Sequence, residues 1–100
     1  MLACFAACAE RRTTFSSTQN GLALTVSVAH RNRGQEVTVV VKDQATSQPI
    51  RTAMVGVETS TLESQATNLH DGSYVAQMPP DDGINVVVSD SGRTAILQLK

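Results

Sequence analysis

The chain is 100 residues long, with 8 basic and 9 acidic residues and a formal net charge of −1. The lack of a basic excess argues against nucleic acid as a partner, because binding to phosphates needs clustered positive charge. Aromatic residues make up only 3% of the chain, so stacking platforms for bases or sugars are not expected. A chain of this length suffices for one domain with a modest hydrophobic core.

The first nine residues, MLACFAACA, form an uncharged apolar run. A helix of this length would reach about 13 Å, less than half of a bilayer's hydrocarbon core, so it cannot span a membrane. Small residues after an apolar run are typical of the end of a secretory signal. The tetrapeptide Phe5-Ala6-Ala7-Cys8 resembles a bacterial lipobox, whose cysteine is lipidated and becomes the mature N-terminus. We therefore interpret residues 1–8 as a partial signal peptide with Cys8 as the lipidation site, and an incidental thiol is the alternative.

Residues 9–21 are mostly polar and show no apolar periodicity. We predict that this stretch is a flexible tether that makes few contacts with the folded domain. As a flexible coil it would span roughly 20 Å, enough to clear a lipid headgroup layer. The folded domain is therefore expected to occupy residues 22–100.

From Leu22 onward, apolar and polar residues alternate with a period of two, the pattern of strands with one buried face. Leu24, Val26 and Val28 show this pattern first. Turn-forming residues such as Asp90-Ser91-Gly92 separate the later segments. The polar run at residues 60–68 leaves a loop and a short edge strand both open. The other expected strands cover residues 22–30, 36–43, 50–59, 73–78, 84–89 and 93–100.

Short strands separated by turns at regular intervals are typical of a β-sandwich. No segment shows the 3.6-residue apolar spacing of an amphipathic helix. The sequence therefore predicts an all-β fold, a small immunoglobulin-like β-sandwich of about six to seven antiparallel strands.

Asp71 and Gly72 directly precede the strand that contains Tyr74, the single tyrosine of the chain. Glycine accepts the positive φ of a tight turn, and aspartate can bond to the backbone two residues further on. Tyr74 is expected in the core with its hydroxyl bonded to the backbone, because a buried unpaired hydroxyl costs about 1–3 kcal/mol. The arrangement resembles the tyrosine corner of immunoglobulin-like sandwiches.

A wider resemblance covers residues 36–90. The stretches KDQATSQPIRTAMVGV and DGSYVAQMPPDDGINVVVSD are similar to the YtkA-like and FixH-like domains of bacterial envelope proteins. The resemblance implies an immunoglobulin-like sandwich, a location in the cell envelope and an accessory role, and it brings no active site. The positions that carry it are Pro49, Ala53, Val55, Asp71, Gly72, Tyr74 and Gly83.

Patterns for catalysis or metal binding are weak in this sequence. No Gly-x-Ser-x-Gly elbow occurs, and the adjacent His70 and Asp71 would point to opposite faces of a strand, so we predict that the chain is not an enzyme. Imidazole and thioether groups suit copper or zinc, but the candidates are not at ligand spacing, and a methionine on a strand is more often core filler. We therefore predict no cofactor and no metal. The candidate ligands are His30, His70, Met54 and Met78.

Val40, Val87 and Ile96 occupy outward positions in the predicted strands. If their strands are neighbours, these residues form an exposed apolar strip, which can mark a partner site. The alternative is that β-branched residues simply suit strands. The last strand, which ends at Lys100, is also a candidate edge for the addition of a partner's strand.

Together these features favour a non-catalytic, secreted or lipid-tethered binding module of the bacterial cell envelope. The expected location is outside the cytoplasm, in the periplasm or the outer envelope. The expected partners are an envelope protein, bound through a sheet face or edge, and the membrane, through a lipid on Cys8. A copper-handling module that uses the His and Met residues named above is the alternative function.

Overall fold

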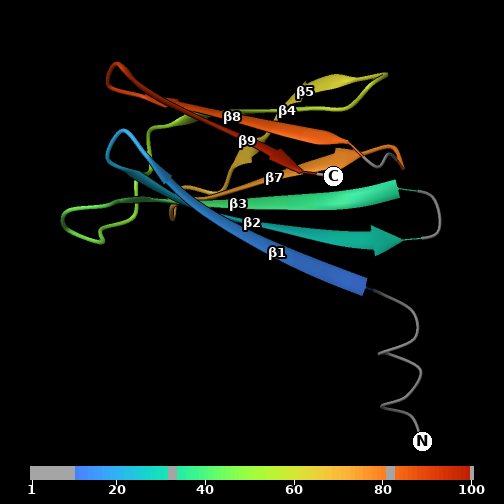
Figure 1. The fold of residues 1–100 in the computed structure, drawn as a ribbon, viewed down its shortest axis with the longest axis horizontal. Coiled ribbons are helices and arrows are strands. Elements are labelled where there is room, and N and C mark those ends of the chain that lie inside the picture. The colour runs from blue at the N-terminus through green and yellow to red at the C-terminus, as the bar shows by residue number, and fades with distance from the viewer. Residues whose placement is uncertain (1–10, 32–33, 81–82, 100) are drawn as a thin grey trace, which may run out of the picture.

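The apolar–polar alternation of the sequence produces two antiparallel β-sheets that pack face to face (Figure 1). The computed structural model describes residues 11–31, 34–80 and 83–99. Within these ranges the chain forms strands, turns and bends and no helix, so no helix that could cross a membrane is found there. The predicted all-β class is confirmed.

The larger sheet has five strands in the order β1-β2-β3-β7-β6. Its register places Val26 of β2 opposite Val39 of β3, and Val39 opposite Tyr74 of β7. Side chains that lie opposite each other point to the same face, so this row contributes to the buried side of the sheet. The strands are β1 (Arg11–Gln19), β2 (Leu22–Arg31), β3 (Gly34–Asp43), β7 (Ser73–Met78) and β6 (Thr67–Asn68).

The smaller sheet has four strands in the order β5-β4-β8-β9. Gly56 of β4 lies between Gln65 of β5 and Val87 of β8, and Val87 in turn pairs with Ile96 of β9. This row lies on the outer side of the sheet, because Val55, Val57, Val86 and Val88 on either side of it are buried. The strands are β5 (Glu63–Gln65), β4 (Met54–Glu58), β8 (Ile84–Asp90) and β9 (Arg93–Leu99).

The strand order from β2 onward is that of an immunoglobulin-like sandwich. Immunoglobulin domains place strands A, B, E and D in one sheet and strands C, F and G in the other, with C′ added beside C in some types. Strands β2, β3, β7 and β6 follow the order A-B-E-D, and β5, β4, β8 and β9 follow C′-C-F-G. The predicted sandwich is therefore present, with β1 as an additional strand beside β2.

The number of strands in the described ranges is nine, not six to seven. Two of the strands beyond the six expected ones come from the polar run at residues 60–68, for which a loop and a short edge strand were both open. This run forms the very short edge strands β5 and β6. The third is β1, in the stretch that the sequence suggested to be a tether.

The prediction of a flexible tether is wrong for the described part of residues 9–21. Arg11–Gln19 forms β1 and pairs with β2 along its whole length. The reason is the turn at Asn20 and Gly21, which both have positive φ, 53° and 81°. Two such residues form the type I′ turn that best suits a two-residue hairpin, and Asn-Gly is its strongest sequence signal. A polar strand is stable here because Phe15 packs against the core from its inner face.

The core lies between the two sheets and is built mainly from valine and leucine. Val39 of the five-stranded sheet and Val86 of the four-stranded sheet both point into the core and are fully buried, as the alternation predicted. Each fully buried side chain of this kind contributes about 1.5–3 kcal/mol relative to an exposed one. The largest fully buried side chains are Tyr74, Leu22, Leu24, Val26, Val37, Val39, Val41, Val55, Val57, Val86 and Val88.

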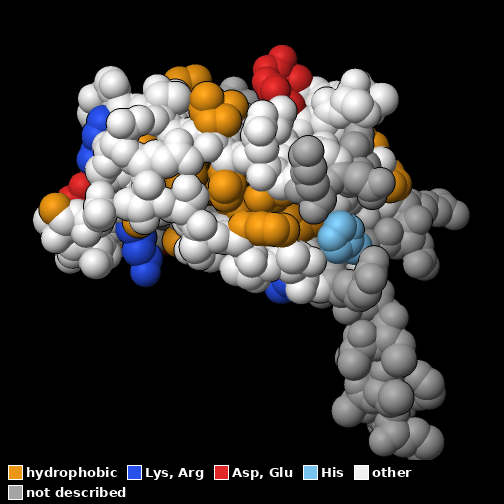
Figure 2. Space-filling view, in the orientation of Figure 1, with side chains coloured by type: hydrophobic (Ala, Val, Ile, Leu, Met, Phe, Trp, Pro, Cys, Tyr) orange, Lys and Arg blue, Asp and Glu red, His pale blue; other side chains and the backbone are white. Residues whose placement is uncertain are grey.

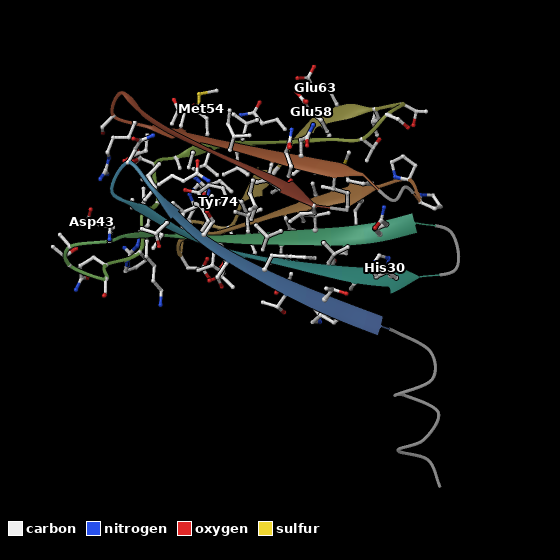
Figure 3. All side chains as sticks on the ribbon, viewed as in Figure 1. His30, Asp43, Met54, Glu58, Glu63 and Tyr74 are labelled. Carbon is white, nitrogen blue, oxygen red and sulfur yellow. The ribbon has the colours of Figure 1, made fainter. Side chains whose placement is uncertain are left out.

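Tyr74 lies between the sheets, and its predicted burial and bonding are confirmed (Figure 3). Its hydroxyl donates to the carbonyl oxygen of Ile50 at 2.8 Å and accepts from the backbone N–H of Ala53 at 3.0 Å. The resemblance to a tyrosine corner is wrong, because that motif sits on strand F and bonds a few residues upstream. Tyr74 is on β7, in the position of strand E, and it anchors the loop between β3 and β4.

Candidate functional site

The outer side of the four-stranded sheet carries a shallow groove, which we call the outer groove. Met54, Gly56 and Glu58 of β4 form its middle, because they alternate with the buried Val55 and Val57. The strands on either side supply its walls through the register described above. The groove encloses about 270 Å³ and is lined by Met54, Val55, Gly56, Glu58, Glu63, Gln65, Val87 and Ser89.

The hollow in the outer groove exists because Gly56 has no side chain. A Cβ atom built on Gly56 would find no heavy atom within 4 Å, so neither packing nor a close backbone contact requires glycine there. Glycine inside a strand is less favourable than alanine by roughly 0.5–1 kcal/mol. Glycine in a strand interior often marks a place where another group approaches closely. Glycine at position 56 therefore lowers the stability of the strand and leaves an open space on the surface.

Apolar side chains lie at this hollow and beside it. Met54 is 63% exposed and Ile96 is 51% exposed, while Val87 between Gly56 and Ile96 is half-buried. Single exposed apolar residues are common on protein surfaces, but here three apolar residues, two of them exposed, lie on one face of one sheet. Figure 2 shows hydrophobic side chains beside acidic ones along the side of the molecule that β4 and β5 form. Such a patch is typical of an interaction surface.

Two carboxylates, Glu58 and Glu63, lie at one end of the outer groove. They are directly opposite each other on β4 and β5, and in Figure 3 both point outward on the same side as Met54. The hydrogen bond to Glu63, together with charge repulsion, raises the pKa of Glu58 above its ordinary value. Like charges directly opposite each other destabilise a sheet. Within the described ranges no lysine, arginine or histidine forms an ion pair with either of them.

The four residues considered as metal ligands are not brought together. Met78 is buried in the core, whereas Met54 is exposed on the outer side of the other sheet. His30 lies near the end of β2, two strands from Met78, with Gln35 between them in the register. Two strand spacings separate their backbones by about 10 Å, and the buried Gln35 lies between them.

His70 lies in the turn before β7, is exposed and has a φ of 66°. The turn agrees with expectation, because the backbone N–H of Ser73 donates to Oδ1 of Asp71 at 2.9 Å. Within the described ranges no group of three or more His, Cys, Asp or Glu side chains could hold a metal ion.

The predicted apolar strip of Val40, Val87 and Ile96 is only partly present. Val87 and Ile96 are direct cross-strand neighbours on the outer side of the four-stranded sheet. Val40 belongs to β3 in the five-stranded sheet and pairs with Thr25 and Ser73, so the prediction is wrong for this residue. The alternation places a side chain inward or outward, but it does not say to which sheet the strand belongs.

The last strand, β9, is an edge strand as predicted, but its edge is not open along its middle. The side chain of Gln19 bonds to both the N–H and the carbonyl of Ile96, and the side chain of Asn20 donates to the carbonyl of Thr94. Residues from β1 and its turn therefore occupy the groups with which a partner's strand would pair. Addition of a strand at this point is disfavoured, which leaves the sheet face as the better surface.

A second charged cluster, formed by Asp43, Asp90 and Arg93, is ion-paired internally. Arg93 donates to Asp43 at 3.1 Å and to Asp90 at 3.3 Å. The hydrogen bond from Thr46, followed by the one from Arg93, lowers the pKa of Asp43 below its ordinary value. Arg93 also donates to the carbonyl of Gly21 at 3.3 Å, so the cluster joins the two sheets near their turns. Its role is structural.

Cys8, the candidate lipidation site, lies outside the described residues. A scan against protein-family models and searches of curated proteins and of solved structures return no match to this chain.

Proposed function

We propose that this chain is a non-catalytic binding module of the bacterial cell envelope that holds a protein partner on the outer face of β5-β4-β8-β9. The observation that carries the proposal is a group of apolar side chains at the hollow beside Gly56. Met54 and the half-buried Val87 line it, and the exposed Ile96 lies next to Val87 on β9. Their exposure to water is unfavourable, and a partner that covers them recovers roughly 25 cal/mol for each Å² of apolar surface buried.

A protein partner fits this surface better than a small molecule does. The outer groove is shallow and open, whereas sites for small ligands enclose most of the ligand surface. The four strands span only three spacings of about 4.8 Å each, so the contact area is at the lower end for stable complexes. A weak or transient complex is therefore expected.

The location in the envelope is supported by the lipobox-like Phe5-Ala6-Ala7-Cys8. β1 begins at Arg11, close behind Cys8 in the sequence, so a lipid on Cys8 would hold the folded domain near the membrane without a long tether. β1 belongs to the five-stranded sheet, whereas the outer groove opens on the far side of the other sheet (Figure 1). Mass spectrometry of the native N-terminus tests this part of the proposal, and an unmodified Cys8 contradicts it.

Site-specific photo-cross-linking in cells tests the binding face. A photo-reactive amino acid at Gln65, which lines the outer groove, should produce a discrete cross-linked protein band. The same amino acid at Ser16, exposed on the outer side of the five-stranded sheet, is the matched control and should produce none. Bands of equal strength at both positions, or none at Gln65, would contradict the proposal.

A further inference from the structure

We infer that the outer groove accepts a lysine side chain of the protein partner, with its aliphatic stem over Gly56 and its ammonium group between Glu58 and Glu63. This inference rests on the proposed function, because the lysine belongs to the protein held on this face. It adds the chemistry by which the partner is recognised.

The hollow at Gly56 fits an aliphatic stem. Its floor is backbone, and Met54 and Val87 border it with apolar side chains. Gly56 and Glu58 are separated by two residues of a strand, or about 7 Å. The five bonds from the Cα to the Nζ of lysine, each about 1.5 Å long, reach roughly 6 Å when extended. Lysine commonly buries its methylene groups along apolar surface in this way while its charged end stays in water.

The two carboxylates favour a positive charge at the end of the bound aliphatic stem. Glu58 and Glu63 repel each other across β4 and β5, and a positive charge between them removes this repulsion. On the other side of Glu58, the same row continues with Asn85 of β8 and Gln98 of β9, which carry no charge. Within the described ranges, Glu63 is therefore the only ionisable group that faces Glu58 on this surface.

A divalent metal ion does not fit the same site as well. Calcium takes six to eight oxygen ligands and magnesium demands a near-octahedral set, whereas Glu58 and Glu63 offer two carboxylates on an open face. The adjoining groove is lined mainly by apolar side chains and backbone, with only Gln65 and Ser89 as further side-chain oxygen donors. A compact ammonium group on a flexible apolar stem matches both parts of the groove.

The test is a titration of the isotope-labelled protein, followed by NMR, with two acetylated and amidated pentapeptides. The first has lysine at its centre between valines, and the second has norleucine, which keeps the stem but lacks the charge. The lysine peptide should bind about fivefold more tightly, the size of an exposed ion pair, and should shift the amide signals of Gly56 and Val87. In a Glu58→Gln/Glu63→Gln variant this preference should disappear, and lowering the pH to about 4 should weaken it, because carboxylates become protonated there.

Glu36→Gln is the matched control, because it removes a carboxylate from the five-stranded sheet and should leave the preference intact. Equal binding of the two peptides to the unmodified protein, or no shift at Gly56 with millimolar lysine peptide, would overturn the inference. Cross-linking at Gln65 would still report whether this face holds a partner. The two failures are therefore distinguishable.

Discussion

The side chain of Gln19 forms two hydrogen bonds with the backbone of Ile96. Its Nε2 donates to the carbonyl oxygen at 2.7 Å, and its Oε1 accepts from the N–H at 3.0 Å. Gln19 ends β1 in one sheet and Ile96 lies in the middle of β9 in the other. The side-chain amide of Gln19 thus makes the two hydrogen bonds that a residue of a neighbouring strand would make with an edge strand. It also connects the two sheets, because β1 and β9 are their edge strands.

Replacing Gln19 by alanine should lower the free energy of unfolding by about 1 kcal/mol, because two solvent-accessible hydrogen bonds to Ile96 and one to the hydroxyl of Ser17 are lost. Urea denaturation measures this change. Gln98→Ala, on the exposed side of β9, is the control and should change stability by less than about 0.5 kcal/mol. Equal effects of the two substitutions would contradict the view that Gln19 connects the sheets.

Tyr74→Phe should cost about 1–3 kcal/mol in the free energy of unfolding, although the ring remains in place. The substitution removes a buried hydroxyl that serves both the carbonyl of Ile50 and the N–H of Ala53, and both groups lose their partner. Denaturation with the same slope but a lower midpoint is the expected observation. A midpoint identical to that of the unmodified protein would mean that the loop between β3 and β4 does not depend on this hydroxyl.

Two glycines should respond in opposite ways to replacement by alanine. At Gly72 a Cβ would lie 2.6 Å from Cβ of Pro49, and φ is 94°, so Gly72→Ala should be strongly destabilising. At Gly56 the space is open and φ is not positive, so Gly56→Ala should leave stability unchanged or raise it by roughly 0.5–1 kcal/mol. Thermal unfolding of both variants tests this contrast. A clear loss of stability in Gly56→Ala would show that the fold needs this glycine.

The stability of the protein should depend on Glu58 in a pH range set by its raised pKa. Because the folded state binds this proton more tightly than the unfolded state, the stability that Glu58 contributes is present at low pH. It is lost as the pH rises from its ordinary pKa of about 4.3 through the raised value. Glu58→Gln should therefore be more stable than the unmodified protein at pH 7, and the difference should shrink toward pH 4. Stability curves that run parallel from pH 4 to pH 7 would contradict the coupling of Glu58 to Glu63.

The fold class could be predicted from the sequence because burial on one side of a strand leaves a direct mark. The alternation of Leu24, Val26 and Val28 identifies the buried face of their strand even when the neighbouring strands are not known. β1 was not predicted as a strand, because its inner face carries Phe15 together with the polar Thr13, Ser17 and Gln19 and so shows no apolar alternation. The signal that could have identified it was local, the Asn20-Gly21 turn directly before a clear strand.

The binding face could be predicted only in part. Val87 and Ile96 have outward positions by alternation, but Val40 has one as well, and only strand pairing separates them. The groove at Gly56 and the position of Glu58 opposite Glu63 both follow from the register in which β4 pairs with β5. No sequence motif indicates how these two short strands pair. An isolated glycine inside a strand pattern was the one available indication that another group approaches there.

The most direct test of the proposed binding face is to fill its hollow. Valine suits a strand, and Gly56 has open space above it, so Gly56→Val should fold normally and keep its melting temperature. With the photo-reactive amino acid at Gln65, this variant should lose the cross-linked partner band that the unmodified protein gives in cells. A band of undiminished strength in a folded Gly56→Val variant would show that the partner does not use this groove.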